Sequence, residues 1–466
     1  MKPEKLNSVY FIGIGGIGMS ALARYFSRLG ISVSGYDRTP TPLTSELIHE
    51  GIPVHFEENL GLIPENPDLV IYTPAVPSDH IEFLHYKRLG FPLKKRAEVL
   101  GLITAPLKTI AVAGTHGKTT TSALIAHILY SAGVDFLAFL GGIAKNYGNN
   151  FIDFPSINNP ASAHTNHKPN RFCVVEADEY DRSFLQLTPH IAIITSADPD
   201  HLDIYGHADD LKRTFEEFTS RIAEGGKLIL KQGVLIKPVH KQHYTEYSYS
   251  VADQASFYAT NIRLDEELFH FDLITPEKRY ADFTLGIPGL FNLENAVAAL
   301  SAGHILGLDE ATMKRALRSY QGVQRRFDFR IRRDDFIYID DYAHHPEELR
   351  ACIGSVRTIY PGKKITGIFQ PHLFTRTRDM AADFARSLEL LDALYLLDIY
   401  PAREKPIEGV DSSMLLDLIR LEHKTQTTKT EVLPLLLKNK PEILMTLGAG
   451  DIDQLVKPIT EAFGKA

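Results

Sequence analysis

Short apolar runs that end in turns and lead into helical patterns recur along the chain. Residues 9–14 form a β-branched apolar run, glycines follow, and residues 19–29 then carry apolar side chains at helical spacing. Two further apolar runs, 31–35 and 69–72, predict more strands. Strands and helices in alternation are typical of an α/β domain with a parallel sheet. We expect a Rossmann-like first domain over residues 1–106.

The middle of the chain repeats this order and then changes its periodicity. An apolar run at 109–113 leads through a glycine-containing loop into helical spacing at 121–132. Between 227 and 287 apolar and polar residues alternate, which predicts added strands, and helical spacing returns at 292–305. We expect a central domain over 107–322 of the P-loop ATPase type, with a mostly parallel sheet. Its other expected strands are 172–175 and 191–195.

The last part of the chain again alternates strand and helix patterns. The apolar runs that predict strands there are 336–339, 365–369, 393–397 and 443–447. Helical segments separate these runs, as in a third α/β domain. We therefore predict an α/β protein of three domains, with a Rossmann-like C-terminal domain over residues 323–466.

The composition is that of an ordinary soluble globular protein. Of the 466 residues 44% are hydrophobic and 23% are charged, which excludes disorder or fibrous structure for the whole chain. Only residues 153–170, rich in Pro, Asn, Ser and His, suggest an exposed loop. A net charge of -8 argues against nucleic acid or an anionic membrane as the main partner, because both attract basic surfaces.

Cysteine usage and hydropathy indicate a cytoplasmic protein without membrane insertion. Cys173 and Cys352 each lie in an apolar stretch and are expected in the core, as in a reducing compartment. The N-terminal apolar run is too short and too rich in glycine for a signal peptide. No stretch reaches the ~20 apolar residues that a membrane-spanning helix requires.

The first glycine loop fits the dinucleotide fingerprint GxGxxG. Its glycines are Gly13, Gly15, Gly16 and Gly18. Asp37 follows at the end of the next expected strand, where a ribose is usually bound. Read alone, this pattern indicates a dehydrogenase, or merely a tight turn. The motif does not specify the ligand, because glycines and a helix N-terminus can bind any diphosphate.

The second loop is more specific for ATP. It follows a strand, opens a helix, and consists of Gly114, Thr115, His116, Gly117, Lys118, Thr119 and Thr120. Lys118 supplies charge for the β- and γ-phosphates, and Thr119 or Thr120 offers a hydroxyl to Mg²⁺. The spacing GxxGKTT is shorter than the common motif, so a glycine turn that happens to contain lysine is the alternative. Together with the first glycine loop, this second loop favours an enzyme that binds two nucleotides over a nicotinamide-dependent enzyme.

Carboxylates and a histidine follow the strands next to this loop. Glu176 comes after the strand at 172–175, and His201 follows the strand at 191–195. Ligands of parallel sheets bind at the carboxyl ends of strands, so both side chains can reach Mg²⁺ beside ATP. A solvated acidic turn is the alternative for Glu176. Four acids within six residues, namely Glu176, Asp178, Glu179 and Asp181, favour a functional site.

Basic and titratable groups gather at strand ends of the third domain. They are Arg325, Arg326, Asp340, Asp341, Tyr342, His344, His345, His372, Arg376 and Arg378. Arginine suits a carboxylate or a phosphate because its planar fork donates two parallel hydrogen bonds. A lone histidine is more often structural, but two adjacent histidines beside two aspartates are harder to explain in that way. We expect these groups to converge on one side of the domain.

Taken together, the motifs resemble the Mur ligases of peptidoglycan synthesis, and within that family the members that add L-alanine to UDP-N-acetylmuramate. The matching stretches are FIGIGGIGMSALA, AGTHGKTTTSA, EADEYDRSFL, DPDHLDIYG, PGLFNLENAVAAL, GVQRRFD, IDDYAHHPEEL, FQPHLFTRTRD and GAGDI. They span all three domains in the family's order. The resemblance implies that the three domains bind the UDP-sugar, ATP and the amino acid. It also implies an acyl phosphate on the lactyl carboxylate, which the amine of L-alanine then attacks.

The resemblance also assigns roles in the nucleotide sites. It implies that Gly15, Gly16 and Gly18 bind the uridine diphosphate, with Asp37 near the nucleoside. Lys118 would hold the γ-phosphate and the developing acyl phosphate. The implied magnesium ligands are Thr119, Glu176 and His201, and the implied adenine contacts are Asn292 and Asn295.

In the third domain the resemblance implies a phosphate contact for Arg326 and a ribose contact for Asp341. The alanine and muramoyl side would be shaped by Tyr342, His344, His372 and Arg376, with Arg376 pairing with the amino acid carboxylate. The catalytic group implied in this way is Lys118, His201, Arg326, His344 and Arg376. A monomer or a weak homodimer is expected.

Three departures from the family pattern limit this transfer. Phe291 stands where the family has histidine, and Leu373 stands where many relatives have arginine. Several sibling ligases carbamylate a lysine in the helix expected at 211–218, where Lys212 offers no clear match, so we do not predict that modification. The alternatives are a murein-recycling ligase that adds a tripeptide to the same sugar nucleotide, an NAD-dependent oxidoreductase, and a nonenzymatic nucleotide-binding switch.

Overall fold

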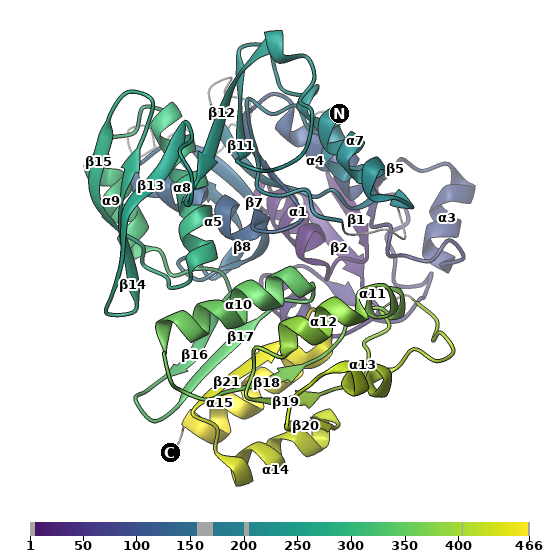
Figure 1. The fold of residues 1–466 in the computed structure, drawn as a ribbon. Helices are drawn as coiled ribbons and strands as arrows, with labels where there is room; N and C mark the ends of the chain where they lie inside the picture. The colour runs from purple at the N-terminus through teal and green to yellow at the C-terminus, as the bar shows by residue number, and fades with distance from the viewer. Residues whose placement is uncertain (1–4, 156–170, 200–204, 403, 465–466) are drawn as a thin grey trace. The chain divides into compact units, whose positions relative to one another are not determined.

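The computed structural model describes residues 5–155, 171–199, 205–402 and 404–464. The chain forms two compact units, and the first contains most of residues 1–321. The second consists of 262–270, 285–293 and 322–466. Three β-sheets with flanking helices confirm the predicted α/β class (Figure 1). The predicted domain boundaries at 106 and 322 stay predictions.

The N-terminal sheet has the strand order β3-β2-β1-β4-β5, and its strands pair in parallel. The strands are β1 (Ser8–Ile12), β2 (Ser32–Tyr36), β3 (Val54–His55), β4 (Leu69–Tyr72) and β5 (Leu93–Lys95). Their helices are α1 (Ile17–Arg28), α2 (Pro42–His49), α3 (Ile81–Leu89) and α4 (Arg96–Thr104). This order, with the first strand in the middle, equals five of the six strands of the Rossmann order 3-2-1-4-5-6 and agrees with the Rossmann-like prediction.

The central sheet has ten strands in the order β15-β14-β13-β12-β11-β10-β6-β9-β7-β8. They are β6 (Lys108–Ala113), β7 (Phe136–Ala144), β8 (Asn149–Phe154), β9 (Phe172–Ala177), β10 (Ile191–Ile194), β11 (Gly226–Lys231), β12 (Tyr244–Ser250), β13 (Phe257–Asp265), β14 (Leu268–Ile274) and β15 (Arg279–Thr284). Strand β6, which carries the ATP loop, lies between β9 and β10 and pairs with both in parallel. The helices of this part are α5 (Lys118–Ser131), α7 (Ala208–Thr219), α8 (Leu290–Ile305) and α9 (Glu310–Ser319).

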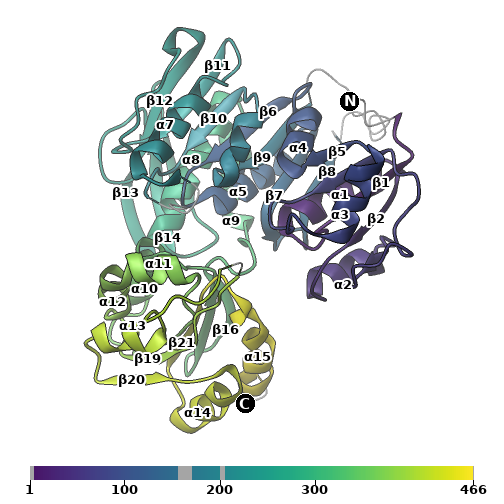
Figure 2. The same cartoon turned by 90° about the vertical axis from the view of Figure 1, so that its right-hand side faces the viewer.

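The antiparallel hairpin of β7 and β8 is a feature that the sequence pattern did not predict. Residues 153 and 154, assigned to an exposed loop, instead end β8. Residues 156–170 of that loop lie outside the described part of the chain. The hairpin borders α1 in both views of the ribbon (Figures 1 and 2).

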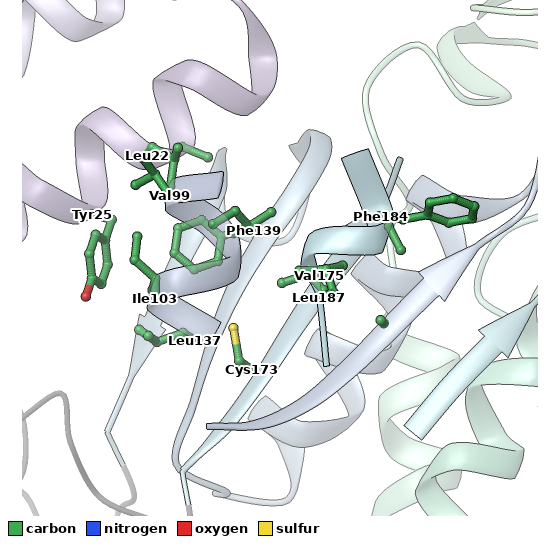
Figure 3. Close-up of a cluster of buried hydrophobic side chains, with 14 of the residues drawn as sticks. Leu22, Tyr25, Val99, Ile103, Leu137, Phe139, Cys173, Val175, Phe184 and Leu187 are labelled. Atoms are coloured by element: carbon green, nitrogen blue, oxygen red, sulfur yellow. The ribbon is translucent and has the colours of Figure 1, made fainter. Parts of the chain in front are cut away.

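One hydrophobic core joins the first two sheets within the first unit. Figure 3 shows side chains from α1, α4 and β7 pointing toward one another, namely Leu22, Tyr25, Val99, Ile103, Leu137 and Phe139. The rings of Tyr25 and Phe139 lie 5.7 Å apart. Close packing of this kind resists deformation. The helix behind the first glycine loop is therefore held firmly against the sheet that carries the ATP loop.

The C-terminal sheet has the order β16-β17-β21-β18-β19-β20, and only β16 is antiparallel to its neighbour among the pairs described. The strands are β16 (Asp328–Arg332), β17 (Ile337–Asp341), β18 (Ile365–Phe369), β19 (Ala393–Leu396), β20 (His423–Gln426) and β21 (Ile443–Leu447). The helices are α10 (Pro346–Ile359), α11 (Phe374–Asp379), α12 (Ala381–Leu388), α13 (Ser412–Leu418), α14 (Lys429–Asn439) and α15 (Val456–Gly464). Separate apolar clusters cover its two faces, as parallel sheets require.

Both cysteines are buried, as expected, and burial raises the pKa of the Cys173 thiol to about 12. Among the helices of the described ranges, none is long and apolar enough to cross a membrane.

Candidate active site

The second glycine loop has the geometry of a phosphate loop. It connects β6 to α5, and both Gly114 (φ +135°) and Gly117 (φ +80°) adopt backbone conformations that favour glycine. A methyl group on Gly114 would lie 2.1 Å from Oγ1 of Thr195. The hydroxyl of Ser196 accepts a hydrogen bond from the backbone N–H of His116 (2.8 Å). Residues at the end of β10 therefore hold the loop open at the N-terminus of α5.

Lys118, the first residue of α5, occupies the centre of this loop. Its ammonium group donates to the carbonyl of Gly114 and forms an ion pair with Glu179, at 2.8 Å and 3.0 Å from the two carboxylate oxygens. Burial would lower the pKa of Lys118, but the carboxylates of Glu179, Glu176 and Asp178 outweigh that effect and raise it above its usual value. Lys118 is thus cationic at neutral pH and ready to bind phosphate.

Glu176 lies at the carboxyl end of β9, beside the loop. Its Oε2 accepts a hydrogen bond from Oγ1 of Thr119 (2.8 Å). Gly141 of β7 makes room for it, because a methyl group there would lie 2.0 Å from the same oxygen. The structure therefore brings together two of the three expected magnesium ligands. His201 lies outside the described residues, and no cluster of three or more His, Cys, Asp or Glu suited to a metal occurs within them.

The two predicted adenine contacts lie on α8 but in different units. Asn295, in the first unit, lies against the ATP loop: its Oδ1 accepts from Thr121 Oγ1 (3.2 Å) and would be 2.5 Å from a methyl group on Gly117. Asn292, in the second unit, is buried and donates to the carbonyl of Pro288 (2.7 Å). The structure places Asn295 at the phosphate loop, while Asn292 orders the turn that precedes α8.

The first glycine loop joins β1 to α1. The backbone N–H groups of Gly13 and Ile14 donate to the carbonyl of Tyr36, at the end of β2. Asp37 follows that strand, and its Oδ2 accepts a hydrogen bond from the N–H of Gly15 (2.7 Å). The Asp37 carboxylate thus lies directly at the glycine loop, and its predicted place near the nucleoside stays a prediction. Gly16 is the N-cap of α1.

Asn150 of the unpredicted hairpin fixes the start of α1. This fully buried side chain donates to the carbonyl of Ile17 (2.6 Å) and to the hydroxyl of Ser20 (3.0 Å). It also accepts a hydrogen bond from Arg24. The two glycine loops therefore belong to one rigid framework, which is a condition for two nucleotides to react at a defined distance.

Several predicted residues of the second unit lie together at the carboxyl ends of β17 and β18, whereas Arg378 is exposed and pairs with its neighbour Asp379. The guanidinium of Arg326 lies 4.8 Å from the Tyr342 ring centre, and that ring lies 5.2 Å from His344. His344 lies 5.8 Å from His372, which is 3.5 Å from Nη1 of Arg376. The fork of Arg376 is almost fully buried. A carboxylate or a phosphate group is the natural partner of such a cationic, aromatic cluster.

Asp341 occupies the centre of this end of the sheet. Its carboxylate accepts hydrogen bonds from the backbone N–H groups of Phe327 (2.6 Å) and Ala343 (2.7 Å). Burial raises the pKa of Asp341 to about 6, against the opposing influence of Arg326 and of these hydrogen bonds. Asp341 therefore shapes the turn that carries Arg326. The predicted ribose contact of Asp341 stays a prediction.

Glu179, Gly141 and Asn150 were not among the predicted site residues. The acidic segment after β9 was the one available signal for Glu179, because it singled out four carboxylates without showing which of them pairs with Lys118. For Gly141 and Asn150 the sequence carried no signal, since their contacts join segments about 35 and 130 residues apart.

Comparison with known proteins agrees with this arrangement. Three family models match successive parts of the chain: "Mur ligase family, catalytic domain" (residues 8–107), "Mur ligase middle domain" (112–303) and "Mur ligase, glutamate ligase domain" (325–450). The UDP-N-acetylmuramate–L-alanine ligase of Parabacteroides distasonis is 49% identical over 100% of this chain and 99% of that protein. The chain belongs to the Mur ligase family. The NAD-dependent oxidoreductase interpretation is thereby excluded.

Other relatives agree with this assignment. The Flavobacterium psychrophilum protein of the same name is 48% identical to this Mur ligase, over 98% of each chain. Among solved structures, UDP-N-acetylmuramate-alanine ligase from Thermotoga maritima superposes with a TM-score of 0.82 at 26% identity, covering 98% of this chain and 99% of that one. A murein peptide ligase from Psychrobacter arcticus, 21% identical over 98% and 99% of the two chains with a TM-score of 0.72, shares the fold.

Proposed function

We propose that this Mur ligase joins L-alanine to the lactyl carboxylate of UDP-N-acetylmuramate, with conversion of ATP to ADP and phosphate. The observation that carries the proposal is the full-length identity of 49% and 48% to relatives named for this reaction. The site supports it, because the first glycine loop, before α1, and the phosphate loop, before α5, lie in one unit. An enzyme of this kind serves peptidoglycan synthesis.

ATP is required because a carboxylate is a poor electrophile. In the proposed reaction, an oxygen of the lactyl carboxylate attacks the γ-phosphorus of ATP, and the bond to ADP breaks. The resulting acyl phosphate is attacked at carbon by the amine of L-alanine, which loses a proton, and phosphate leaves. Lys118 carries the charge that stabilises the transferred phosphoryl group, since it is cationic and lies at the N-terminus of α5.

Mg²⁺ is the proposed metal, and the donor set beside the loop fits it. Thr119 and Glu176 present hard oxygen donors 2.8 Å apart, which is the chemistry that Mg²⁺ prefers. The ion would neutralise phosphate charge next to Lys118. His201, at the predicted third position, stays part of this proposal.

The amino acid site is proposed at the carboxyl ends of β17 and β18. Arg376 would pair with the alanine carboxylate, with His344, His372 and Tyr342 around it and Arg326 facing a phosphate group. The support is the chain of contacts from Arg326 to Arg376. We propose further that Gly15, Gly16 and Gly18 receive the uridine diphosphate and Asp37 the nucleoside. Asn292 and Asn295 would meet adenine and Asp341 the ribose of ATP.

A cytoplasmic location and a monomer or weak homodimer complete the proposal. The absence of a suitable spanning helix from the described ranges and the two buried thiols agree with that location. Fractionation of cells would test the location. Sedimentation at increasing protein concentration would test the oligomeric state, because a weak dimer dissociates on dilution.

The test of the function is phosphate release by purified protein with ATP, Mg²⁺ and UDP-N-acetylmuramate. L-Alanine is compared with L-alanyl-γ-D-glutamyl-diaminopimelate, the tripeptide of the recycling reaction. We expect release that depends on L-alanine, and formation of an amide product by mass spectrometry. Release that depends only on the tripeptide would instead establish the recycling ligase, and no amine-dependent release would reject both.

A further inference from the structure

Arg96 is a largely buried cation whose position the proposed reaction does not explain. It is the first residue of α4, yet its side chain lies against the first turn of α1. A methyl group on Gly18 would lie 2.8 Å from Nη1 of Arg96 and 3.1 Å from its Cδ. The absence of a side chain at Gly18 therefore lets the guanidinium reach the glycine loop.

The other edge of the same guanidinium binds the acidic segment that follows β9. Nη2 of Arg96 donates to Oδ2 of Asp178 (3.0 Å), and the Arg96 side chain is only 19% exposed. Asp178 is one of the carboxylates that raise the pKa of Lys118. Arg96 thus lies between the first glycine loop and the acidic segment after β9, with Nη1 near Gly18 and Nη2 on Asp178.

A cation beside the first glycine loop would strengthen the binding of a diphosphate there. The Asp37 carboxylate already occupies the N–H of Gly15, and a like charge repels a phosphate oxygen at short range. We considered the position that a methyl group would take on each glycine of this loop. Among the atoms nearest to these positions, the positively charged group is the guanidinium of Arg96. A planar guanidinium can donate hydrogen bonds to a carboxylate and a phosphate at the same time, because its N–H donors lie on separate edges.

We propose that Arg96 binds the diphosphate of the sugar nucleotide through Nη1 while Nη2 stays on Asp178. The inference rests on the proposed function, since it takes UDP-N-acetylmuramate as the ligand of the first loop. It adds a residue that couples the sugar nucleotide to the acidic segment beside Lys118.

The experiment is calorimetric titration of the full-length protein with UDP, which needs no turnover. The variants are Arg96→Gln, Arg96→Lys and Asp178→Asn. Arg28→Gln is the matched control, because it removes a cation from the far, exposed end of α1. ADP is titrated in parallel, and thermal unfolding confirms that each variant is folded.

We expect Arg96→Gln to weaken UDP binding by roughly 10- to 100-fold, the range of a lost charge-assisted hydrogen bond. Arg96→Lys should restore part of that affinity. Asp178→Asn should leave UDP binding unchanged or strengthen it, since the cation remains and its competing carboxylate is gone. ADP binding to Arg96→Gln and UDP binding to Arg28→Gln should stay within about twofold of the wild type.

A purely structural tether between the loops gives a different pattern. Arg96→Gln and Asp178→Asn would then weaken UDP binding equally, and this result would overturn the proposal. So would unchanged UDP affinity in folded Arg96→Gln. Alanine-dependent phosphate release by the wild-type protein reports on the proposed function separately, so the two ideas can fail independently.

Discussion

The ion pair of Lys118 and Glu179 allows the catalytic and structural roles of the lysine to be separated. We consider the change Lys118→Met, which keeps an unbranched side chain one atom shorter and removes the charge. Glu179 is only 1% exposed and would lose its ion pair with Lys118. Glu176 and Asp178 also act on Lys118, and Asp178 would keep its ion pair with Arg96.

The size of the effect follows from the burial of both partners. Removing one partner of a buried ion pair costs about 3–5 kcal/mol, because the remaining charge stays desolvated. The Lys118 side chain is 12% exposed, so we take the lower end, about 3 kcal/mol. The double variant Lys118→Met with Glu179→Gln removes both charges and should lose at most about half of that.

The loss of stability in Lys118→Met should depend on pH in one direction. Without Lys118, protonation of the buried Glu179 carboxylate removes a charge that the lysine no longer balances. The folded state then gains by taking up a proton. The defect of Lys118→Met should be full at pH 8 and shrink as the pH falls toward about 5.

The assays are urea unfolding at pH 8 and pH 5, and phosphate release at pH 8. We expect the double variant to recover stability but not activity, with turnover about 100- to 1,000-fold below the wild type in both variants. Equal stability of Lys118→Met and the wild type would refute the buried-pair argument. Near-normal turnover in the double variant would refute the role of Lys118 in phosphoryl transfer.

Three further outcomes are expected. Gly141→Ala should lower turnover about 10- to 100-fold and raise the Mg²⁺ concentration needed for half-maximal phosphate release, because the methyl group displaces the Glu176 carboxylate. Carbon-13 NMR of Asp341 should show a midpoint near its pKa of about 6, and its protonation should favour the folded state as the pH falls through that value. Arg376→Ala should raise the KM for alanine at least about tenfold and leave the KM for ATP within about twofold.

Matched controls make these outcomes decisive. Gly354→Ala, in a helix with open space around it, should leave turnover unchanged. Arg378→Ala removes an exposed arginine two residues from Arg376 and should not change the KM for alanine. Equal effects in control and test variants would contradict the placement of the site. A midpoint for Asp341 below 4 would show that burial does not dominate its environment.

Local patterns predicted most of the strands and the two glycine loops. The runs 69–72, 365–369 and 443–447 agree with β4, β18 and β21 at both ends, because buried parallel strands are continuous apolar runs. Six strands were missed, namely β3, β5, β7, β8, β16 and β20. In the β7–β8 hairpin, residues such as Asn150 serve contacts with α1 rather than a regular alternation.

The sequence by itself determined the α/β class, the two phosphate loops and the residue types of the site, since these depend on short-range periodicity and on glycines at fixed spacing. Only the tertiary structure decided which charges meet. It paired Lys118 with Glu179 among four nearby acids, set Arg96 against Gly18, and placed Glu176 beside Gly141. The physical reason is that such contacts join segments tens of residues apart. Sheet order and core packing bring these segments together, and a local sequence pattern does not predict such contacts.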